Sequence, residues 1–357
     1  MYKDKSLFQS GNLKPKVVIF NLATDSNDSK LAATIDWIRE FSQVCESVFV
    51  FSTHVGSYEL PDNVKVFELG GGNYIQKIRW FYNILWAANF TIKLRGKKVV
   101  FHYMNQFTAV FPGIMFKIFG IRQGLWYAHG YKSKILYFAE KIVDLGFTSA
   151  PGAFPIKSRK VIYLGQGIKI VNFDTFEYKD FYSKKGIVSL GRIHPVKNLD
   201  KLLYALPIKK EINLEFLGDD SNTKYVQHIL SISENRNLNL NIKGEILYED
   251  VPNYLSSWKY YYCGTDISVD KASIEASLAG CIILTMNENV MNLSGMTEVY
   301  KYLGMVPPDN ILEQLEVFEN ISTDQLSQIQ RILFKISSER NDVSQSISIV
   351  LSRLLSV

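Results

Sequence analysis

The sequence predicts an α/β protein built from two doubly wound domains. At 357 residues the chain exceeds a typical single hydrophobic core. Apolar runs of strand length alternate with segments of helical periodicity, which is typical of βαβ units and a mostly parallel sheet. A polar interruption near residues 165–185 separates two similar halves. We therefore expect domains over residues 1–172 and 173–335, and a C-terminal helix over 336–357 that could cross back to the first domain.

Five strands and four helices are predicted in the first half. Short apolar runs place the strands at 17–20, 47–52, 64–69, 98–103 and 124–128. Apolar residues at helical spacing place the helices at 30–41, 75–88, 108–119 and 132–143. The glycine run 70–72 is expected to be a loop.

The second half repeats the alternation. Its strands are predicted at 186–189, 213–217, 240–242, 260–263 and 281–285, and its helices at 199–206, 225–232, 251–258 and 272–278. Residues 310–355 are expected to form two or three further helices. Two such halves suit a two-substrate enzyme whose ligands bind in a cleft between them.

Composition points to the cytoplasm and away from metal binding. Hydrophobic residues make up 47% and charged residues 21% of the chain, as in soluble proteins. Cys45, Cys263 and Cys281 lie in or beside apolar runs without metal-ligand spacing, so we expect buried thiols. The N-terminus is polar, and no segment has the length and apolarity of a membrane span.

Charge is distributed unevenly along the chain. Residues 1–175 carry 22 Lys+Arg and 12 Asp+Glu, a net charge of +10, whereas residues 176–357 carry 18 and 23, a net charge of −5. The basic half could face an anionic lipid surface or a phosphate-bearing substrate; the alternative is a set of solvated lysines. We expect no nucleic-acid partner.

A basic, aromatic stretch runs from Lys77 through Arg79 and Trp80 to Trp86. It could rest on the inner face of a membrane, or contact the acceptor, with its aromatic rings at headgroup depth. The alternative is a core helix with basic flanks.

One loop carries two cations at the end of a predicted strand. Gly191 and Arg192 follow the strand 186–189, and Lys197 precedes the helix that starts at Leu199. Ligands of open α/β sheets bind at the carboxyl ends of strands, and two fixed cations suit a diphosphate.

A second motif lies downstream, at residues 268–284. Glu275 is expected to open a helix of small residues that ends at Gly280. The helix dipole favours a carboxylate there, and such a group can accept hydrogen bonds from vicinal hydroxyls. The alternative is a simple capping glutamate.

Together, the two motifs resemble those of the retaining glycosyltransferases of family 4, which have the GT-B fold. The similarity covers about residues 99–285, in order and at compatible spacing. Four further segments contribute to it: Trp126–Gly130, Thr148–Ser149, Lys160–Ile168 and Asn241–Ile246.

The resemblance implies a role for each matching residue. Arg192 and Lys197 would clamp the pyrophosphate of a UDP- or GDP-linked sugar and stabilise the leaving group, with Gly191 beside it. His129 would reach the donor sugar across the cleft, Glu275 would hold the ribose, and backbone around Gly244, Glu245 and Ile246 would meet the base. The reaction would retain anomeric configuration and need no metal or other cofactor. The acceptor would be a glycan or a lipid-linked glycan, as in O-antigen or capsule synthesis.

The chain departs from the family pattern at two places. A glutamate expected eight residues before Glu275 is replaced by Ile267, and either Asp266 or Asp270 could take its sugar-binding role. A glycine pair expected after the first strand is absent from residues 21–26. His102 comes after Val99–Phe101, near the end of the predicted strand 98–103, and could face the acceptor, or be a core histidine.

Two rival functions stay open. One is a nucleotide-sugar epimerase of the same fold, which needs no acceptor. The other is an inactive nucleotide-sugar-binding subunit, suggested by Ile267.

Overall fold

The structure, a computed structural model, describes residues 14–28, 31–71, 74–173 and 181–356; at 74–77 it describes only the backbone. The chain forms two compact units. The first contains residues up to Ile168 and the segment from Val343 onward, and the second contains Lys169–Asp342. The chain therefore passes between the units at residue 168, against the predicted 172, and again at residue 342, against the predicted 335.

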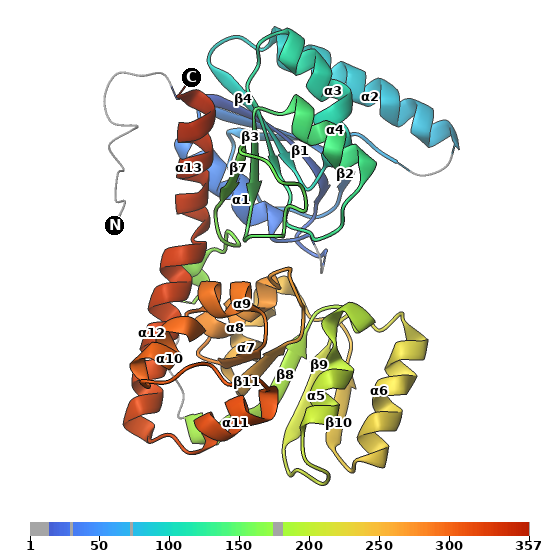
Figure 1. Cartoon of the computed structure of the whole chain (residues 1–357). Coiled ribbons are helices and arrows are strands. Elements are labelled where there is room, and N and C mark those ends of the chain that lie inside the picture. The colour runs from blue at the N-terminus through green and yellow to red at the C-terminus, as the bar shows by residue number, and fades with distance from the viewer. Residues whose placement is uncertain (1–13, 29–30, 72–73, 174–180, 357) are drawn as a thin grey trace. The chain divides into compact units, whose positions relative to one another are not determined.

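A seven-stranded parallel sheet forms the centre of the first unit, in the order β3-β2-β1-β4-β5-β6-β7 (Figure 1). The strands are β1 Lys16–Thr24, β2 Ser47–Val55, β3 Val64–Glu68, β4 Lys98–Tyr103, β5 Gln123–Trp126, β6 Leu145–Thr148 and β7 Val161–Tyr163. The last two, which have four and three residues, were not predicted.

Helices cover both faces of this sheet, which explains its continuous apolar strands. They are α1 Thr34–Val44, α2 Tyr74–Lys93, α3 Gln106–Ile118, α4 Lys134–Ile142 and α13 Val343–Leu355. Val17 and Ile19 of β1 pack in one core with α1 and α13. Val18 and Phe20 pack in a second core with α2 and α3.

The C-terminal helix α13 is part of the first unit. The backbone N–H of Val343 donates to the carbonyl of Ile168 at 3.0 Å, and the Ser346 hydroxyl donates to the Leu164 carbonyl at 3.1 Å. Ile347 and Leu351 are buried in the core shared with α1. The last helix therefore completes one face of a sheet formed by the start of the chain.

A five-stranded parallel sheet forms the centre of the second unit, in the order β10-β9-β8-β11-β12. The strands are β8 Lys185–Leu190, β9 Asn213–Leu217, β10 Asn239–Lys243, β11 Trp258–Cys263 and β12 Ile282–Thr285. The helices are α5 Leu199–Ala205, α6 Thr223–Asn235, α7 Val251–Ser256, α8 Lys271–Leu278, α9 Glu288–Ser294, α10 Met296–Tyr302, α11 Ile311–Glu319 and α12 Thr323–Asn341. Trp258 was predicted to end a helix, but it opens β11.

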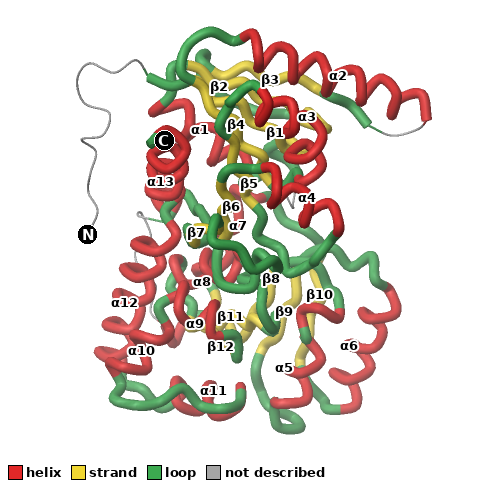
Figure 2. Tube along the Cα trace, turned by 45° about the horizontal axis from the view of Figure 1, so that its top comes forward, coloured by secondary structure: helices red, strands yellow, loops and turns green. Residues whose placement is uncertain are grey.

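The strand order of the second sheet reverses beside β8. The chain proceeds from β8 through β9 to β10 on one side, then returns to place β11 and β12 on the other. Figure 2 shows these strands with helices around them. The loops that follow β8 and β11 therefore leave the same edge of the sheet side by side, which is where open α/β sheets bind ligands. The predicted doubly wound α/β fold is confirmed.

Removing a side chain of α13 tests its contribution to the first unit. We expect Leu351→Ala to lower the free energy of unfolding of this unit by about 2–5 kcal/mol, because it leaves a cavity in a sealed core. Ile118→Ala, at a side chain that is 75% exposed, should change it by less than about 0.5 kcal/mol. Urea unfolding followed by circular dichroism measures both; equal stability of the two variants would contradict the packing described.

Candidate functional site

The loop after β8 holds the Lys197 ammonium over the backbone of Gly191. Gly191 has φ +125°, and a Cβ there would lie 3.0 Å from Lys197 Nζ. A Cβ on Gly218 would lie 2.2 Å from the Gly191 carbonyl oxygen. Two closely approaching glycines thus leave the backbone open beneath a cation, an arrangement that suits an anionic ligand.

Asn198 ties this loop to the loop after β11. It has left-handed backbone (φ 48°) between the short helix Pro195–Lys197 and α5. Its Nδ2 donates to the Gly264 carbonyl at 2.6 Å, and the Tyr262 hydroxyl donates to the Asn198 carbonyl at 2.9 Å. These bonds fix the position of the two loops relative to each other.

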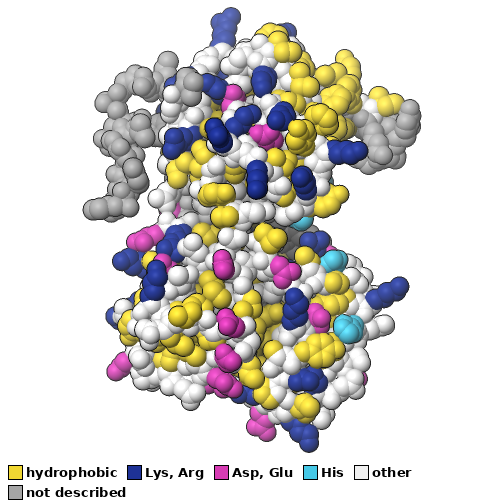
Figure 3. All heavy atoms as spheres, in the orientation of Figure 1, with side chains coloured by type: hydrophobic (Ala, Val, Ile, Leu, Met, Phe, Trp, Pro, Cys, Tyr) yellow, Lys and Arg dark blue, Asp and Glu magenta, His cyan; other side chains and the backbone are white. Residues whose placement is uncertain are grey.

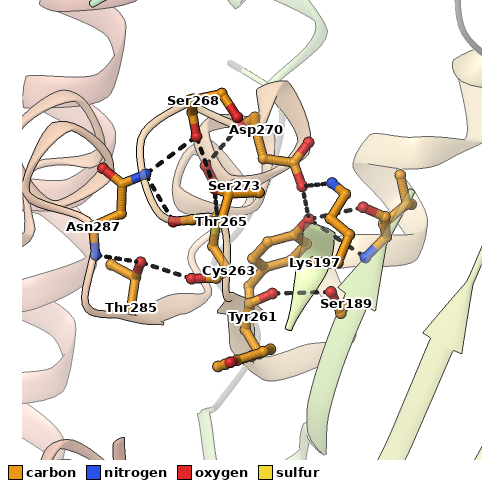
Figure 4. Close-up of polar contacts among 12 residues, drawn as sticks. Ser189, Lys197, Tyr261, Cys263, Thr265, Ser268, Asp270, Ser273, Thr285 and Asn287 are labelled. Carbon is orange, nitrogen blue, oxygen red and sulfur yellow. Dashed lines mark hydrogen bonds and ion pairs between the residues drawn. The ribbon is translucent and has the colours of Figure 1, made fainter. Parts of the chain in front are cut away.

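Lys197 forms an ion pair with Asp270, at the far end of the loop after β11 (Figure 4). The side chains are only 13% and 16% exposed. The hydroxyl of fully buried Tyr261 lies 3.2 Å from the same carboxylate oxygen and 3.0 Å from the Leu190 carbonyl. Burial, and then the charge of Asp270, raise the Tyr261 pKa well above its usual value. Tyr261 is thus a neutral donor beneath the ion pair.

Polar bonds fix the loop that carries Asp270. Asn287 Nδ2 donates to the carbonyls of Thr265 and Ser268, at 2.9 and 3.2 Å. The Ser273 hydroxyl donates to the Asp270 carbonyl at 2.6 Å. Figure 4 shows this network around the loop. Hydrogen bonds to the backbone of this loop therefore fix the position of the Asp270 carboxylate.

The two candidate aspartates occupy different environments. Asp266 is 77% exposed and lies 3.8 Å from Lys201, which is itself 62% exposed. Ile267, at the position where the resemblance leads one to expect glutamate, is 57% exposed. Of the two aspartates, Asp270 is therefore the one that pairs with Lys197, the lysine predicted to bind the diphosphate.

Arg192 is exposed at the carboxyl end of β8. It makes no hydrogen bond or ion pair with the part of the chain that the structure describes. Its guanidinium can therefore bind a ligand without giving up an internal partner, whereas Lys197 is paired with Asp270.

Glu275 lies in the second turn of α8 and does not open it as predicted, because the helix begins at Lys271. Its side chain is 5% exposed, and Oε1 lies 3.1 Å from Lys271 Nζ. Lys271 also donates to the Tyr248 hydroxyl and lies 4.2 Å from the centre of that ring. Glu275, Lys271 and Tyr248 therefore form one cluster. Tyr248 follows the predicted base-binding residues Gly244, Glu245 and Ile246, which lie in the loop after β10.

His129 lies in the first unit, exposed just beyond the carboxyl end of β5. Its Nδ1 accepts a hydrogen bond from the backbone N–H of Tyr131 at 3.0 Å. In the neutral ring the proton is therefore on Nε2, which can donate to a ligand oxygen.

His102 is not open to an acceptor. It is fully buried between the Thr108 hydroxyl (3.0 Å from Nδ1) and Gln123 Oε1 (3.2 Å from Nε2). Burial lowers its pKa to about 3. Its geometry is that of the alternative, a core histidine.

The predicted membrane-side residues lie on α2. Arg79 is exposed, whereas Trp80 is half-buried with its ring 4.9 Å from that of Phe107. The side chain of Lys77 lies outside the described residues.

The cysteines are free and buried, as predicted. Burial raises the pKa of Cys45 and Cys281 to about 12. Within the described ranges, no three His, Cys, Asp or Glu side chains gather as a metal site would require. No helix in the described part of the chain has the length and apolarity to cross a bilayer.

Sequence reasoning missed four residues of this site: Asn198, Tyr248, Tyr261 and Lys271. Tyr261 lies in an apolar strand and Lys271 beside a predicted helix start, so no sequence pattern marked them. Asn198 stood within the first motif, but its role depends on a carbonyl 66 residues away.

The Lys197–Asp270 pair gives a first test of the site. We expect Asp270→Asn to lower the free energy of unfolding of the second unit by about 1–3 kcal/mol, because it leaves a largely buried ammonium without its counter-charge. Asp266→Asn, in an exposed pair, should cost less than about 1 kcal/mol. Denaturant unfolding measures the free energy of unfolding of both variants. Equal losses in Asp266→Asn and Asp270→Asn would show that the Lys197–Asp270 pair is no more important to stability than the exposed pair.

His102 predicts a pH dependence of stability. Its pKa is about 3 in the folded chain and 6.5 when unperturbed, so between these values the unfolded chain binds a proton that the folded chain does not. Protonation of His102 therefore does not reduce the free energy of unfolding above pH 6.5. Below pH 6.5 it lowers the free energy of unfolding progressively as the solution is acidified. Relative to pH 7, we expect the parent to lose about 2 kcal/mol more than His102→Gln at pH 5. Urea titrations at both pH values measure this, and parallel losses would exclude it.

No protein-family profile and no curated protein matches the sequence. Several solved structures match the fold across most of the chain. HepE of Anabaena in complex with UDP-glucose is 14% identical, with a TM-score of 0.70 over 96% of this chain and 100% of that one. A glycosyltransferase from Rickettsia africae is 12% identical, with a TM-score of 0.71 over 96% and 99%. The lipopolysaccharide outer core galactosyltransferase WaaB is 11% identical, with a TM-score of 0.59 over 96% and 100%. The predicted GT-B fold of glycosyltransferases is thereby confirmed.

Proposed function

We propose that the chain is a glycosyltransferase that moves a sugar from a UDP- or GDP-linked donor to a hydroxyl acceptor, with retention and without a metal. The observation that carries the proposal is the meeting of Gly191, Lys197 and Asp270 at the point where the second sheet reverses its strand order. The solved structures of similar fold include complexes with UDP and UDP-glucose, which supports a nucleotide-sugar donor.

Arg192 and Lys197 carry the electrostatic part of the proposal. The bond between the anomeric carbon and the diphosphate oxygen breaks with its electron pair on that oxygen, and a bond to the acceptor oxygen forms. The proton of the acceptor hydroxyl passes to the departing diphosphate. Negative charge grows on the departing diphosphate, where fixed cations stabilise the transition state more than the bound donor. Asp270 balances Lys197 before the donor binds, and Arg192 supplies the unpaired cation.

The remaining residues are assigned to the rest of the donor. Glu275 accepts from Lys271 through Oε1, so its other oxygen is assigned to a ribose hydroxyl. The backbone of residues 244–246 is assigned to the base. His129, with a donor N–H on Nε2, is assigned to a sugar oxygen.

We infer that the acceptor is a lipid-linked glycan of surface polysaccharide, O-antigen or capsule, at the inner face of the cell membrane. Two observations support this: the net charge of +10 in residues 1–175, and the fold shared with a lipopolysaccharide galactosyltransferase.

The donor site is tested by ligand stabilisation. A sugar nucleotide that binds only the folded chain raises its melting temperature, so UDP- and GDP-sugars can be screened on the parent. We expect Arg192→Ala with Lys197→Ala to weaken donor binding at least about 100-fold, because two charge-assisted contacts are lost. Lys224→Ala, at an exposed lysine of α6 in the same unit, is the matched control.

Turnover separates this proposal from its rivals. With chelator present, the parent should transfer or hydrolyse the donor, and the double variant should not. Activity that vanishes with EDTA but survives the double substitution would exclude the mechanism. A new nucleotide sugar formed without acceptor would indicate an epimerase, and binding without turnover an inactive subunit.

A further inference from the structure

Helix α2 is apolar on the side that faces away from the core. Ile84, Ala87 and Ala88 are buried against the sheet, as expected for a surface helix. The exposed side is apolar as well and follows the helical repeat: Ile78, Phe81, Tyr82, Leu85 and Trp86 are all exposed, Tyr82 to 74%. Water is a poor solvent for five such neighbours, so this side of α2 favours contact with another apolar phase.

Helix α3 extends the apolar surface. Phe111, Ile114 and Ile118 are exposed on one side of α3, and Phe119 follows its end. The rings of Phe81 and Phe111 meet edge to face at 5.2 Å and join the two helices. We name these nine side chains the α2–α3 face. Figure 3 shows hydrophobic side chains gathered in the region of these helices, with lysines and arginines around them.

The surrounding sequence has one sign of charge. Residues 69–139 contain no Asp or Glu, and their ten cations are Lys77, Arg79, Lys93, Arg95, Lys97, Lys98, Lys117, Arg122, Lys132 and Lys134. Arg79, Lys93, Arg95 and Lys117 are exposed on or just beyond α2 and α3. An apolar surface with cations around it is complementary to lipid chains beneath anionic headgroups.

A bilayer fits this surface better than a protein does. Two copies of the chain that met through it would bring like charges together across a symmetric interface. Protein interfaces are also depleted in lysine. Tyrosine and tryptophan are enriched at protein interfaces and where membranes meet water, so the cations decide in favour of an anionic bilayer.

We propose that the α2–α3 face docks the first unit on an anionic membrane, with Ile78, Tyr82 and Ile118 entering the headgroup region and Lys93 and Arg95 pairing with lipid phosphates. The inference rests on the proposed function only in that a lipid-linked acceptor lies in such a membrane. Donor binding is not needed to test it.

The test is co-sedimentation of the full chain with vesicles of phosphatidylcholine, with and without phosphatidylglycerol. We expect binding only when phosphatidylglycerol is present, and weakening by salt. Ile78→Ser, Tyr82→Ser and Ile118→Ser combined should weaken it about tenfold or more. Lys93→Ala with Arg95→Ala should weaken it about fivefold for each cation removed. These five side chains are exposed, so the variants should unfold at the parent's temperature.

Matched substitutions elsewhere complete the design. Tyr163→Ser and Ile208→Ser replace hydrophobics that are 57% and 62% exposed, and Lys224→Ala removes an exposed cation; these variants should bind as the parent does. The proposal is overturned if the parent ignores anionic vesicles, or if the face variants bind as well as the controls. A parent dimer in sedimentation that the face variants dissociate would assign the face to a second copy instead. Donor stabilisation of the face variants, measured in parallel, should equal that of the parent, so a failed docking surface is distinguishable from a failed donor site.

Discussion

The reversal of strand order beside β8 is the constraint on which the candidate site depends. All strands of the second sheet are parallel, so their carboxyl ends share one edge. Because β11 pairs directly with β8, two loops far apart in sequence become neighbours. Hydrogen bonds through Asn198 then fix the distance between these loops. Lys197 and Asp270 meet only because this pairing brings them together.

The Lys197–Asp270 ion pair explains how a largely buried cation is tolerated at the candidate ligand site before a ligand binds. A lysine only 13% exposed would be costly without a counter-charge, and Asp270 and the Tyr261 hydroxyl lower this cost. The absence of a side chain on Gly191 leaves space beside the ammonium. A diphosphate would replace one carboxylate by a ligand of higher charge, while exposed Arg192 has no partner in the described chain to give up. The Lys197–Asp270 pair is thus neutral without ligand, and Arg192, unpaired within the described residues, adds a positive charge that would favour an anion.

The two units divide the chain's chemistry. The second, built from the acidic half of the sequence, holds Lys197 in an ion pair with Asp270 and leaves Arg192 exposed beside it. The first combines a sheet buried on both faces with helices that stay apolar on their outer side. The outer side of these helices does not contribute to the hydrophobic core, because their inner side is the one that packs against the sheet. Its aromatic residues and one-signed charge are therefore better explained by an external partner than by folding.

The alternation of apolar runs by itself determined the α/β class, most strands and the doubly wound halves, because strand and helix periods are local properties of a sequence. The spacing of Gly191, Arg192 and Lys197 likewise predicted a loop with two cations at the carboxyl end of a strand, which is where the structure places them. Only tertiary structure decided which aspartate meets Lys197, that Glu275 is buried beside Lys271, and that His102 is enclosed by Thr108 and Gln123. It also decided which of two apolar sides of α2 is covered. Those outcomes depend on contacts between distant segments, and periodicity carries no information about which segments meet.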